Sequence, residues 1–377
     1  MRIDLDQNAT TRLDPRAAAA MRAALDELHG NPSSLHEEGR RARDAIETAR
    51  REVAALIGAA PSEIVFTSGG TEANVLGIVG AARAAGRRAR VVASPLEHPS
   101  VRGALDALAA DGFTIEKIGV DEAGRIAPRD VEAALAGGAA LACFARAQNE
   151  LGTLYDVDQF AGSARRAGAL LHCDAVQAVG KVPVDVKALG VDLLALSAHK
   201  IHGPKGIGAL WIRSGTPFAP PLGGHQERGL RPGTENLLGI VGFGVAARLA
   251  REEASRSWAA QAALRDRLER AALEIPGARR HGDADRRVPN TTSIAFRGVP
   301  GDVLVAALDL EGVAASTGSA CTSGTVEPSA VLLALGLPRD RAAEAIRLSL
   351  GRDTTEADID RVAALLPRLV ERIRASL

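Results

Sequence analysis

The chain has no excess of charge of either sign and no long apolar run. Its 377 residues include 46 basic and 46 acidic side chains, so the formal net charge is zero. A balanced charge argues against a dominant electrostatic partner such as nucleic acid or an anionic membrane. No apolar run approaches the roughly 20 residues that a membrane span needs. The N-terminal stretch MRIDLDQNATTRLD has acidic residues and no apolar signal-peptide core, so we expect a cytoplasmic protein.

Cysteine is also scarce. The chain has three cysteines, Cys143, Cys173 and Cys321, and no Cys-x-x-Cys spacing, which excludes a disulfide framework of the kind that holds small secreted domains together. Cys143 and Cys173 lie in apolar runs and are expected to be small core residues. Cys321 lies among serine, threonine and glycine in ASTGSACTSGTVEPSA, so we expect an exposed, reactive thiol on a loop.

Strand-like and helix-period segments alternate over the first two-thirds of the chain. Strands separated by helices of this length predict βαβ units and a mostly parallel sheet covered by helices on both faces. The expected strands are 63–68, 90–95, 114–120, 140–145, 169–176, 191–197 and 208–212. The expected helices are 14–30, 36–58, 71–86, 101–112, 127–138 and 156–168. Asp14 with Pro15 predicts the start of the first helix, and Gly58 the end of the second.

The pattern changes after a helical stretch that runs from about Ile240 to Leu273. The segments NTTSIAFRGV and AIRLSL, followed by a C-terminal amphipathic helix, indicate a smaller α+β unit. We therefore predict an α/β fold with a large domain over 15–255. A small domain made of 1–14 and 256–377 would carry Cys321.

Polar groups follow several of the predicted strands at their carboxyl ends, where open α/β sheets bind ligands. They are Ser68-Gly69-Gly70-Thr71, Glu97-His98, Gln148-Asn149, Asp174 with Gln177, and Ser197 with His199 and Lys200. So many polar strand ends predict a ligand site at this edge of the sheet.

Three of these groups point to one cofactor. The glycines of SGGTEAN permit close backbone approach, and the helix that Thr71 opens attracts an anion, without the lysine of a nucleotide-hydrolysing loop. Asp174 and Lys200 lie 26 residues apart, one βαβ-like step, and the surroundings of Asp174 lack metal-ligand spacing. An acid for a pyridinium nitrogen, a lysine for an aldehyde and an anion cradle together describe a pyridoxal phosphate site. Each motif alone also fits a glycine-rich turn, a helix cap or a surface lysine.

The same residues belong to longer motifs that carry a resemblance. These are GNPSSLH, EIVFTSGGTEAN, EHPSV, QNELG, HCDAVQAVGK, SAHKIHGPKGIGAL, ERGLRPGTEN, STGSACTSGTVEPS and IRLSLGR. In this order, from Asp6 to Arg352, they resemble cysteine desulfurases of the NifS/IscS type, in the class V branch of fold-type I pyridoxal phosphate enzymes.

The resemblance implies roles for the cofactor-side residues. Lys200 would bond to the cofactor aldehyde and later move the substrate Cα proton. Asp174 would pair with the pyridine nitrogen, and Gln177 would contact the phenolic oxygen. His98 would stack on the ring and act as an acid–base group near the substrate thiol. The remaining cofactor contacts would come from Gly70, Thr71, Asn149, Ser197 and His199, and from Thr234 on the phosphate of a neighbouring subunit, which implies a homodimer.

The resemblance also implies the reaction. Asn8, Asn149 and Arg347 would orient L-cysteine, with Arg347 on its α-carboxylate. Cys321 would take the sulfur as a persulfide while alanine leaves. The sulfur would then pass to a scaffold or carrier protein for iron–sulfur cluster, thio-cofactor or tRNA biosynthesis, and SACTSGTVEPS resembles the longer-loop group that makes such transfers.

The chain departs from the family pattern beside the substrate. Gln148 stands where asparagine is usual, and Arg146 where a small side chain or histidine is common. Three alternatives stay open: a selenocysteine lyase, a class V aminotransferase, and a catalytically idle sulfur-transfer adaptor. The intact Lys200, Asp174 and Cys321 argue against the last of these.

Overall fold

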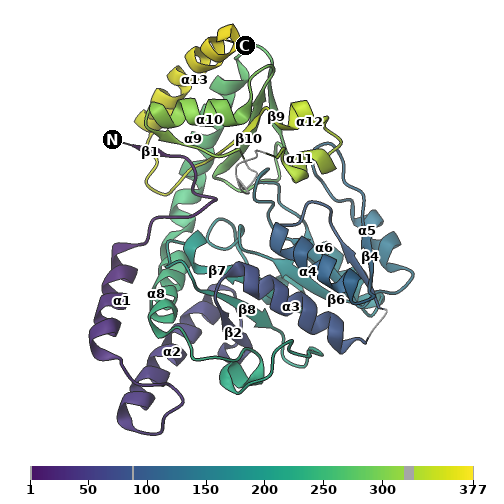
Figure 1. The fold of residues 1–377 in the computed structure, drawn as a ribbon, viewed down its shortest axis with the longest axis vertical. Helices are drawn as coiled ribbons and strands as arrows, with labels where there is room; N and C mark the ends of the chain where they lie inside the picture. The colour runs from purple at the N-terminus through teal and green to yellow at the C-terminus, as the bar shows by residue number, and fades with distance from the viewer. Residues whose placement is uncertain (1, 87–88, 318–326, 377) are drawn as a thin grey trace.

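The computed structural model describes residues 2–86, 89–317 and 327–376, with a large and a small sheet one above the other in Figure 1. The large sheet has seven strands in the order β2-β8-β7-β6-β5-β3-β4. Only β8 runs antiparallel to its neighbours in this sheet. Its strands are β2 (Ile64–Thr67), β3 (Arg90–Ala93), β4 (Thr114–Lys117), β5 (Leu141–Ala145), β6 (Leu170–Asp174), β7 (Leu193–Ser197) and β8 (Gly208–Ile212). The predicted α/β class is confirmed.

Helices cover both faces of this sheet because alternate strand residues point to opposite sides. One face packs against α3 (Gly70–Ala84) and α4 (Pro99–Ala110), through residues such as Val91 and Ala195. The other face, through residues such as Phe66 and Phe144, packs against α2 (Glu37–Leu56), α5 (Pro128–Leu135), α6 (Val157–Arg166) and α8 (Leu237–Glu253). The sheet is therefore buried on both sides, as its nearly continuous apolar strands predict.

The local start and stop signals act as expected. Asp14 caps α1 (Pro15–Glu27) by accepting the Arg16 amide hydrogen at 2.8 Å. Gly58, just after α2, has φ of +69°, a left-handed conformation that glycine adopts at no steric cost. Cys143 and Cys173 are buried free thiols, as predicted, whereas Cys321 lies outside the described residues.

The C-terminal part has its own sheet and core. Strands β9 (Ala278–His281), β10 (Thr291–Phe296) and β12 (Ala345–Ser349) form an antiparallel sheet. Helices α9 (Ser255–Leu273), α10 (Gly301–Leu310) and α13 (Glu356–Ser376) lie around it in Figure 1. The N-terminal strand β1 (Ile3–Asp4) pairs with β11 (Val313–Ala314), and Ile3 and Leu5 join this C-terminal core. Short helices complete the chain: α7 (Val186–Leu189), α11 (Ala330–Ala334) and α12 (Arg339–Ala342).

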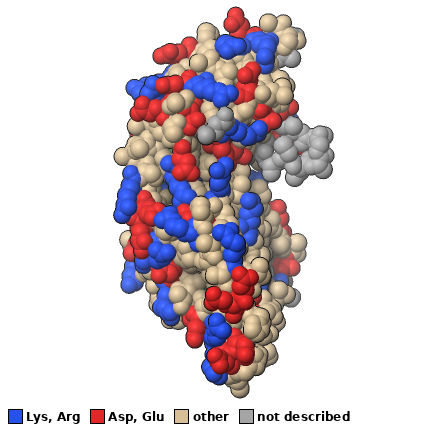
Figure 2. Space-filling model, turned by 90° about the vertical axis from the view of Figure 1, so that its left-hand side faces the viewer, with Lys and Arg blue, Asp and Glu red and all other residues tan. Residues whose placement is uncertain are grey.

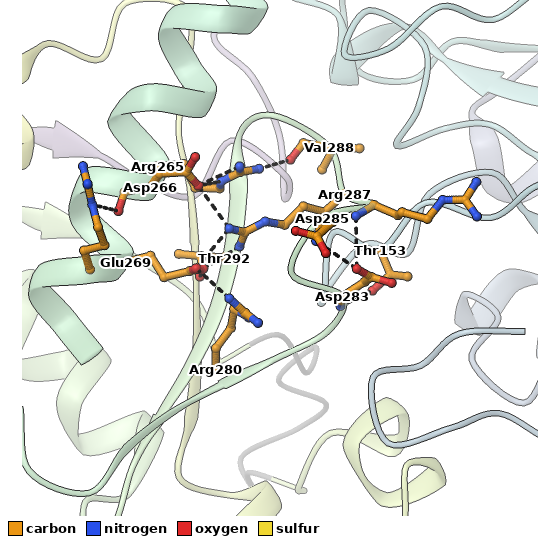
Figure 3. A network of polar contacts seen from close by, with 12 residues as sticks. Thr153, Arg265, Asp266, Glu269, Arg280, Asp283, Asp285, Arg287, Val288 and Thr292 are labelled. Carbon is orange, nitrogen blue, oxygen red and sulfur yellow. Dashed lines mark hydrogen bonds and ion pairs between the residues drawn. The ribbon is translucent and has the colours of Figure 1, made fainter. Parts of the chain in front are cut away.

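A buried polar network joins the small sheet to the loop after β5 (Figure 3). Glu269 of α9 binds Arg280 and Arg287, and Arg287 also binds Asp266. Asp283 lies between Arg280 and Arg287, and its backbone amide donates to the Thr153 hydroxyl at 3.1 Å. Because Thr153 closely follows Asn149, the C-terminal part is tied directly to the edge of the predicted site.

The surface agrees with the balanced composition. On the face shown in Figure 2, basic and acidic side chains are interspersed. Among the residues that the structure describes, no helix is both long enough and apolar enough to cross a membrane.

Candidate active site

A cavity of about 390 Å³ lies at the carboxyl ends of the parallel strands. Its size suits a cofactor or small ligand. Most of the predicted site residues line it: Asn8, Gly70, Thr71, His98, Asn149, Asp174, Gln177, Ser197, His199, Lys200 and Arg347. Thr234 does not line it, and Cys321 lies outside the described residues.

One wall of the cavity is suited to an anion. Helix α3 begins at Gly70, directly after β2, so its first N–H groups have no partner within the helix. A Cβ on Gly70 would come within 2.8 Å of Val176, so only glycine leaves this wall open. The Ser197 hydroxyl is buried and has no hydrogen-bond partner within the described part of the chain, although buried hydroxyls normally have one. A bound phosphate would satisfy both Ser197 and the helix N-terminus.

Asp174, at the end of β6, is held in one orientation. Its Oδ2 accepts from Asn74 Nδ2 of α3 at 2.7 Å, and its Oδ1 accepts from the Val176 amide at 2.9 Å. The Asn74 amide also donates to the Ser100 hydroxyl at 3.0 Å. A fixed carboxylate inside the cavity is the partner that a protonated ring nitrogen requires.

Lys200 follows β7 in a short turn of 3₁₀ helix. Its Nζ donates to the backbone carbonyls of Asn8 at 2.6 Å and Ala9 at 2.8 Å. Burial, together with the Arg347 charge, lowers the pKa of Lys200 to about 8. A substantial fraction of this amine is therefore neutral near physiological pH, which a nucleophilic lysine needs.

Two histidines of the cavity are weak bases. His98 is the N-cap of α4, where its Nδ1 accepts from the Ser100 amide at 3.1 Å and lies 2.7 Å from the Ser100 hydroxyl. Burial lowers the pKa of His98. Burial and the Lys200 charge lower the pKa of His199 to about 4, and its Nδ1 lies 3.2 Å from the Thr10 hydroxyl. Both rings are therefore mainly neutral at pH 7.

The substrate-side residues are more constrained than the sequence suggested. The Asn8 side chain is buried and forms hydrogen bonds with Thr291, Lys181, Asn290 and the Asn149 carbonyl. Arg347 of β12 binds Asp6 at 2.8 Å and the Asn149 carbonyl at 3.2 Å, and its Nε is buried with no hydrogen-bond partner among the residues that the structure describes. The roles of Asn8 and Arg347 in orienting the substrate stay predictions.

Of the two departures from the family pattern, Gln148 lines the cavity and Arg146 does not. The Gln148 oxygen accepts the Leu151 amide hydrogen at 2.8 Å, and its nitrogen donates to the Leu96 carbonyl at 3.2 Å. The Arg146 guanidinium binds the Tyr155 carbonyl and is not among the residues lining the cavity. Gln148 therefore shapes its loop, and Arg146 points elsewhere.

Thr234 is exposed and lines a separate cavity of about 190 Å³ with Ser68 and Arg231. Its predicted contact with the cofactor phosphate of a neighbouring subunit stays a prediction. The segment that leads to Cys321 starts at the main cavity, because Ser316 pairs with Arg347 through backbone hydrogen bonds of 2.6 and 3.2 Å.

Sequence reasoning missed polar residues at or beside this site, among them Asn74, Ser100 and Lys181. Asn74 and Ser100 stand inside the quoted motifs SGGTEAN and EHPSV, one helical turn or less from residues that were chosen. Lys181 stands four residues after Gln177, the spacing that places two side chains on one helical face. Those spacings were the available signal.

The fold and the site together define a class. The chain belongs to the aminotransferase class-V family, whose sequence profile matches residues 3–362. Membership implies pyridoxal phosphate as the cofactor, and the anion wall, Asp174 and Lys200 fit that group.

Individual relatives are more specific. A cysteine desulfurase of Cereibacter sphaeroides is 49% identical over 378 residues, covering 99% of this chain and 97% of that protein. A solved structure described as a NifS-like protein matches with a TM-score of 0.92 and 34% identity, over 99% of this chain and 100% of its own. A structure of SspA in complex with cysteine matches with a TM-score of 0.82 and 31% identity, over 94% of this chain and 100% of its own.

Proposed function

We propose that this protein is a pyridoxal phosphate-dependent cysteine desulfurase, which converts L-cysteine to L-alanine and leaves the sulfur as a persulfide on Cys321. The observation that carries the proposal is that Lys200, Asp174 and the N-terminus of α3 line one cavity. The full-length similarity to cysteine desulfurases supports the same conclusion.

The cofactor would be held at both ends. Gly70, Thr71, Ser197 and His199 would bind its phosphate, and Asp174 its ring nitrogen. Asn149 and Gln177 would contact it from the side, with His98 stacked on the ring. When bound, pyridoxal phosphate supplies an aldehyde for amines and a ring that withdraws electrons from the substrate Cα.

The side chains of the protein would then bind the amino acid and move its protons. Arg347 would attract the α-carboxylate, since its Nε has no hydrogen-bond partner in residues 2–86, 89–317 and 327–376. Lys200, with a pKa of about 8, would take the Cα proton in its neutral form and return a proton as an ammonium group. His98, mainly neutral, would accept the substrate thiol proton.

The sulfur step needs no external oxidant or reductant. The Cys321 thiolate would attack the substrate sulfur, so that an S–S bond forms as the Cβ–S bond breaks. The electron pair of the broken bond goes to Cβ, which gains a proton and becomes the methyl group of alanine. Cys321 stands five positions after Ser316, and five residues span at most roughly 17 Å, so the thiol can reach the cavity.

Several wider features belong to the same proposal. We propose a large domain over 15–255 and a small domain of 1–14 with 256–377, supported by the separate core that Ile3 and Leu5 share with the C-terminal helices. We also propose a cytoplasmic homodimer in which Thr234 reaches the neighbouring phosphate. The persulfide would pass to a scaffold or carrier protein for iron–sulfur cluster, thio-cofactor or tRNA biosynthesis.

The proposal is tested by incubating the cofactor-loaded protein with L-cysteine and locating the added sulfur by peptide mass spectrometry. We expect 32 mass units on the Cys321 peptide (the mass of one sulfur atom) and alanine in solution. Cys321→Ala should still change its visible spectrum with cysteine but release no sulfide under reducing conditions. Cys143→Ala is the matched control, because burial raises the pKa of that thiol and keeps it inert.

Other outcomes would replace the proposal. Undiminished sulfide release by Cys321→Ala would refute the role of that thiol. Faster turnover of L-selenocysteine would indicate a selenocysteine lyase, and pyruvate-dependent amino transfer without sulfide would indicate an aminotransferase. A purified protein that binds no pyridoxal phosphate would indicate an adaptor.

A further inference from the structure

Lys181 is a buried lysine that carries no predicted role. It stands four positions after Gln177, within a run of turns, and is only 8% exposed. The structure shows no ion pair to it within residues 2–86, 89–317 and 327–376. Burial, with the charges of Lys200 and Arg347, lowers its pKa well below the usual value. A buried amine without a carboxylate partner is costly, so its contacts call for an explanation.

Those contacts are amide oxygens on the wall of the active-site cavity. Lys181 Nζ donates to Asn8 Oδ1 at 2.6 Å and to Gln177 Oε1. Lys181 also lines a second cavity of about 330 Å³, which shares Lys200 with the first. The Lys181 amine therefore lies outside the first cavity, on the side of the second, and does not occupy the space where a ligand would bind.

The N–H groups of Lys181 decide which way Gln177 points. The Lys181 amine donates to the Gln177 side-chain oxygen, so this contact favours the orientation in which that oxygen faces Lys181. The Gln177 NH2 group then faces the cavity side, where it donates to the Asn8 backbone carbonyl at 2.9 Å. That bond uses one of its two hydrogens, and the other is available to an acceptor in the cavity.

Removing Lys181 would leave the Gln177 oxygen buried without its donor, which is unfavourable. The Lys200 amine offers a replacement, because Lys200 Nζ and Gln177 Nε2 donate to the same Asn8 carbonyl, at 2.6 and 2.9 Å. Asn8 is less dependent on Lys181, since Asn290 also donates to its Oδ1 at 3.2 Å. Gln177 is therefore the residue whose orientation depends on the hydrogen bond from Lys181.

We infer that Lys181 is a positioning residue that holds the Gln177 amide with its NH2 group toward the cavity, as a donor to the phenolic oxygen of the cofactor. This inference rests on the proposed function. It assigns Lys181 an effect on cofactor binding that acts entirely through Gln177.

A double-mutant cycle tests the inference by equilibrium binding of pyridoxal phosphate to the cofactor-free protein. Lys181→Met, Gln177→Ala and the double variant should each raise the dissociation constant about tenfold, the value of one hydrogen bond. The visible band of the bound cofactor should move to the same wavelength in all of them. Lys187→Met, which removes an exposed lysine of α7, is the matched control and should bind as the unchanged protein does.

Thermal unfolding of the cofactor-free variants separates an effect on positioning from an effect on folding. We expect Lys181→Met and the unchanged protein to have the same unfolding midpoint temperature. Should that variant fail to fold, Lys181→Gln, which keeps an N–H donor without charge, should restore binding relative to Lys181→Ala. Effects that multiply to about a hundredfold in the double variant would overturn the inference. A dissociation constant of Lys181→Met equal to that of Lys187→Met would also overturn the inference. An unchanged protein that binds no pyridoxal phosphate would refute the proposed function first, and this inference with it.

Discussion

Replacing Glu269 with glutamine should destabilise the protein by about 3 kcal/mol at neutral pH, although the change lies outside the active site. Glu269 is 4% exposed and accepts from Arg280 at 3.1 Å and from Arg287 at 3.0 Å (Figure 3). Thr292 donates to its other oxygen. Glutamine keeps the shape of the side chain but removes the charge that neutralises these arginines.

The magnitude comes from the acidity of this carboxyl group. Burial by itself raises the pKa of Glu269, but the hydrogen bonds from Arg287 and Thr292 outweigh burial and lower the pKa from 4.5 to about 2. Each unit of pKa shift corresponds to about 1.4 kcal/mol, which gives about 3 kcal/mol for the charged form in the folded state.

The sign of this effect predicts its pH dependence. Because the folded pKa is depressed, the stabilisation is complete above pH 4.5 and is lost as pH falls toward 2. The assay is urea unfolding at several pH values, followed by the fluorescence of Trp258, which lies on α9 with Glu269. The difference in the free energy of unfolding between the unchanged protein and Glu269→Gln should be constant above about pH 5.5 and should become smaller below pH 4.5.

Glu274→Gln, at the exposed C-cap of the same helix, is the matched control and should change stability by less than about 0.5 kcal/mol. The reasoning would be refuted if Glu269→Gln were as stable as this control at pH 7. It would also be refuted if the difference in the free energy of unfolding did not change with pH down to 3.

Further predictions concern the cavity. The rate at which cofactor-free protein captures pyridoxal phosphate should rise with pH around a midpoint of about 8, because burial lowers the pKa of Lys200. Stopped-flow absorbance measures the rate, and a midpoint near the ordinary lysine value of about 10.5 would contradict the assignment. Arg347→Gln should move that midpoint upward, since the Arg347 charge contributes to the low pKa. Asn74→Ala should weaken cofactor binding about tenfold in equilibrium titration by removing a 2.7 Å bond to Asp174, and Gln159→Ala, on the exposed face of α6, should not.

The type of each element of the large sheet, and the order of these elements along the chain, could be predicted from the sequence. Alternation of short apolar runs with helical periods predicted each parallel strand, and Asp14 and Gly58 marked helix ends correctly, since caps act within a few residues. The antiparallel direction of β8 was not predicted, because strand direction depends on how the connecting turn crosses the sheet.

The composition of the cavity wall was predicted in part. Motifs at strand ends indicated most of its residues, because parallel strands bring their carboxyl ends to one edge. The hydrogen bonds of Asn8 with Thr291 and Lys181 were not foreseen, and its predicted contact with the substrate stays a prediction. Partners that lie hundreds of positions away leave no local signal.

The sequence by itself determined the class of fold, the family and the chemistry of the groups at the strand ends, because periodicity, capping and residue type act over short stretches of chain. Only the tertiary structure decided how acidic or basic those groups are and which way they face. Burial lowers the pKa of Lys200, and the Asn8 carbonyl accepts from both Lys200 and Gln177, because distant segments exclude water and supply hydrogen-bond partners at that point.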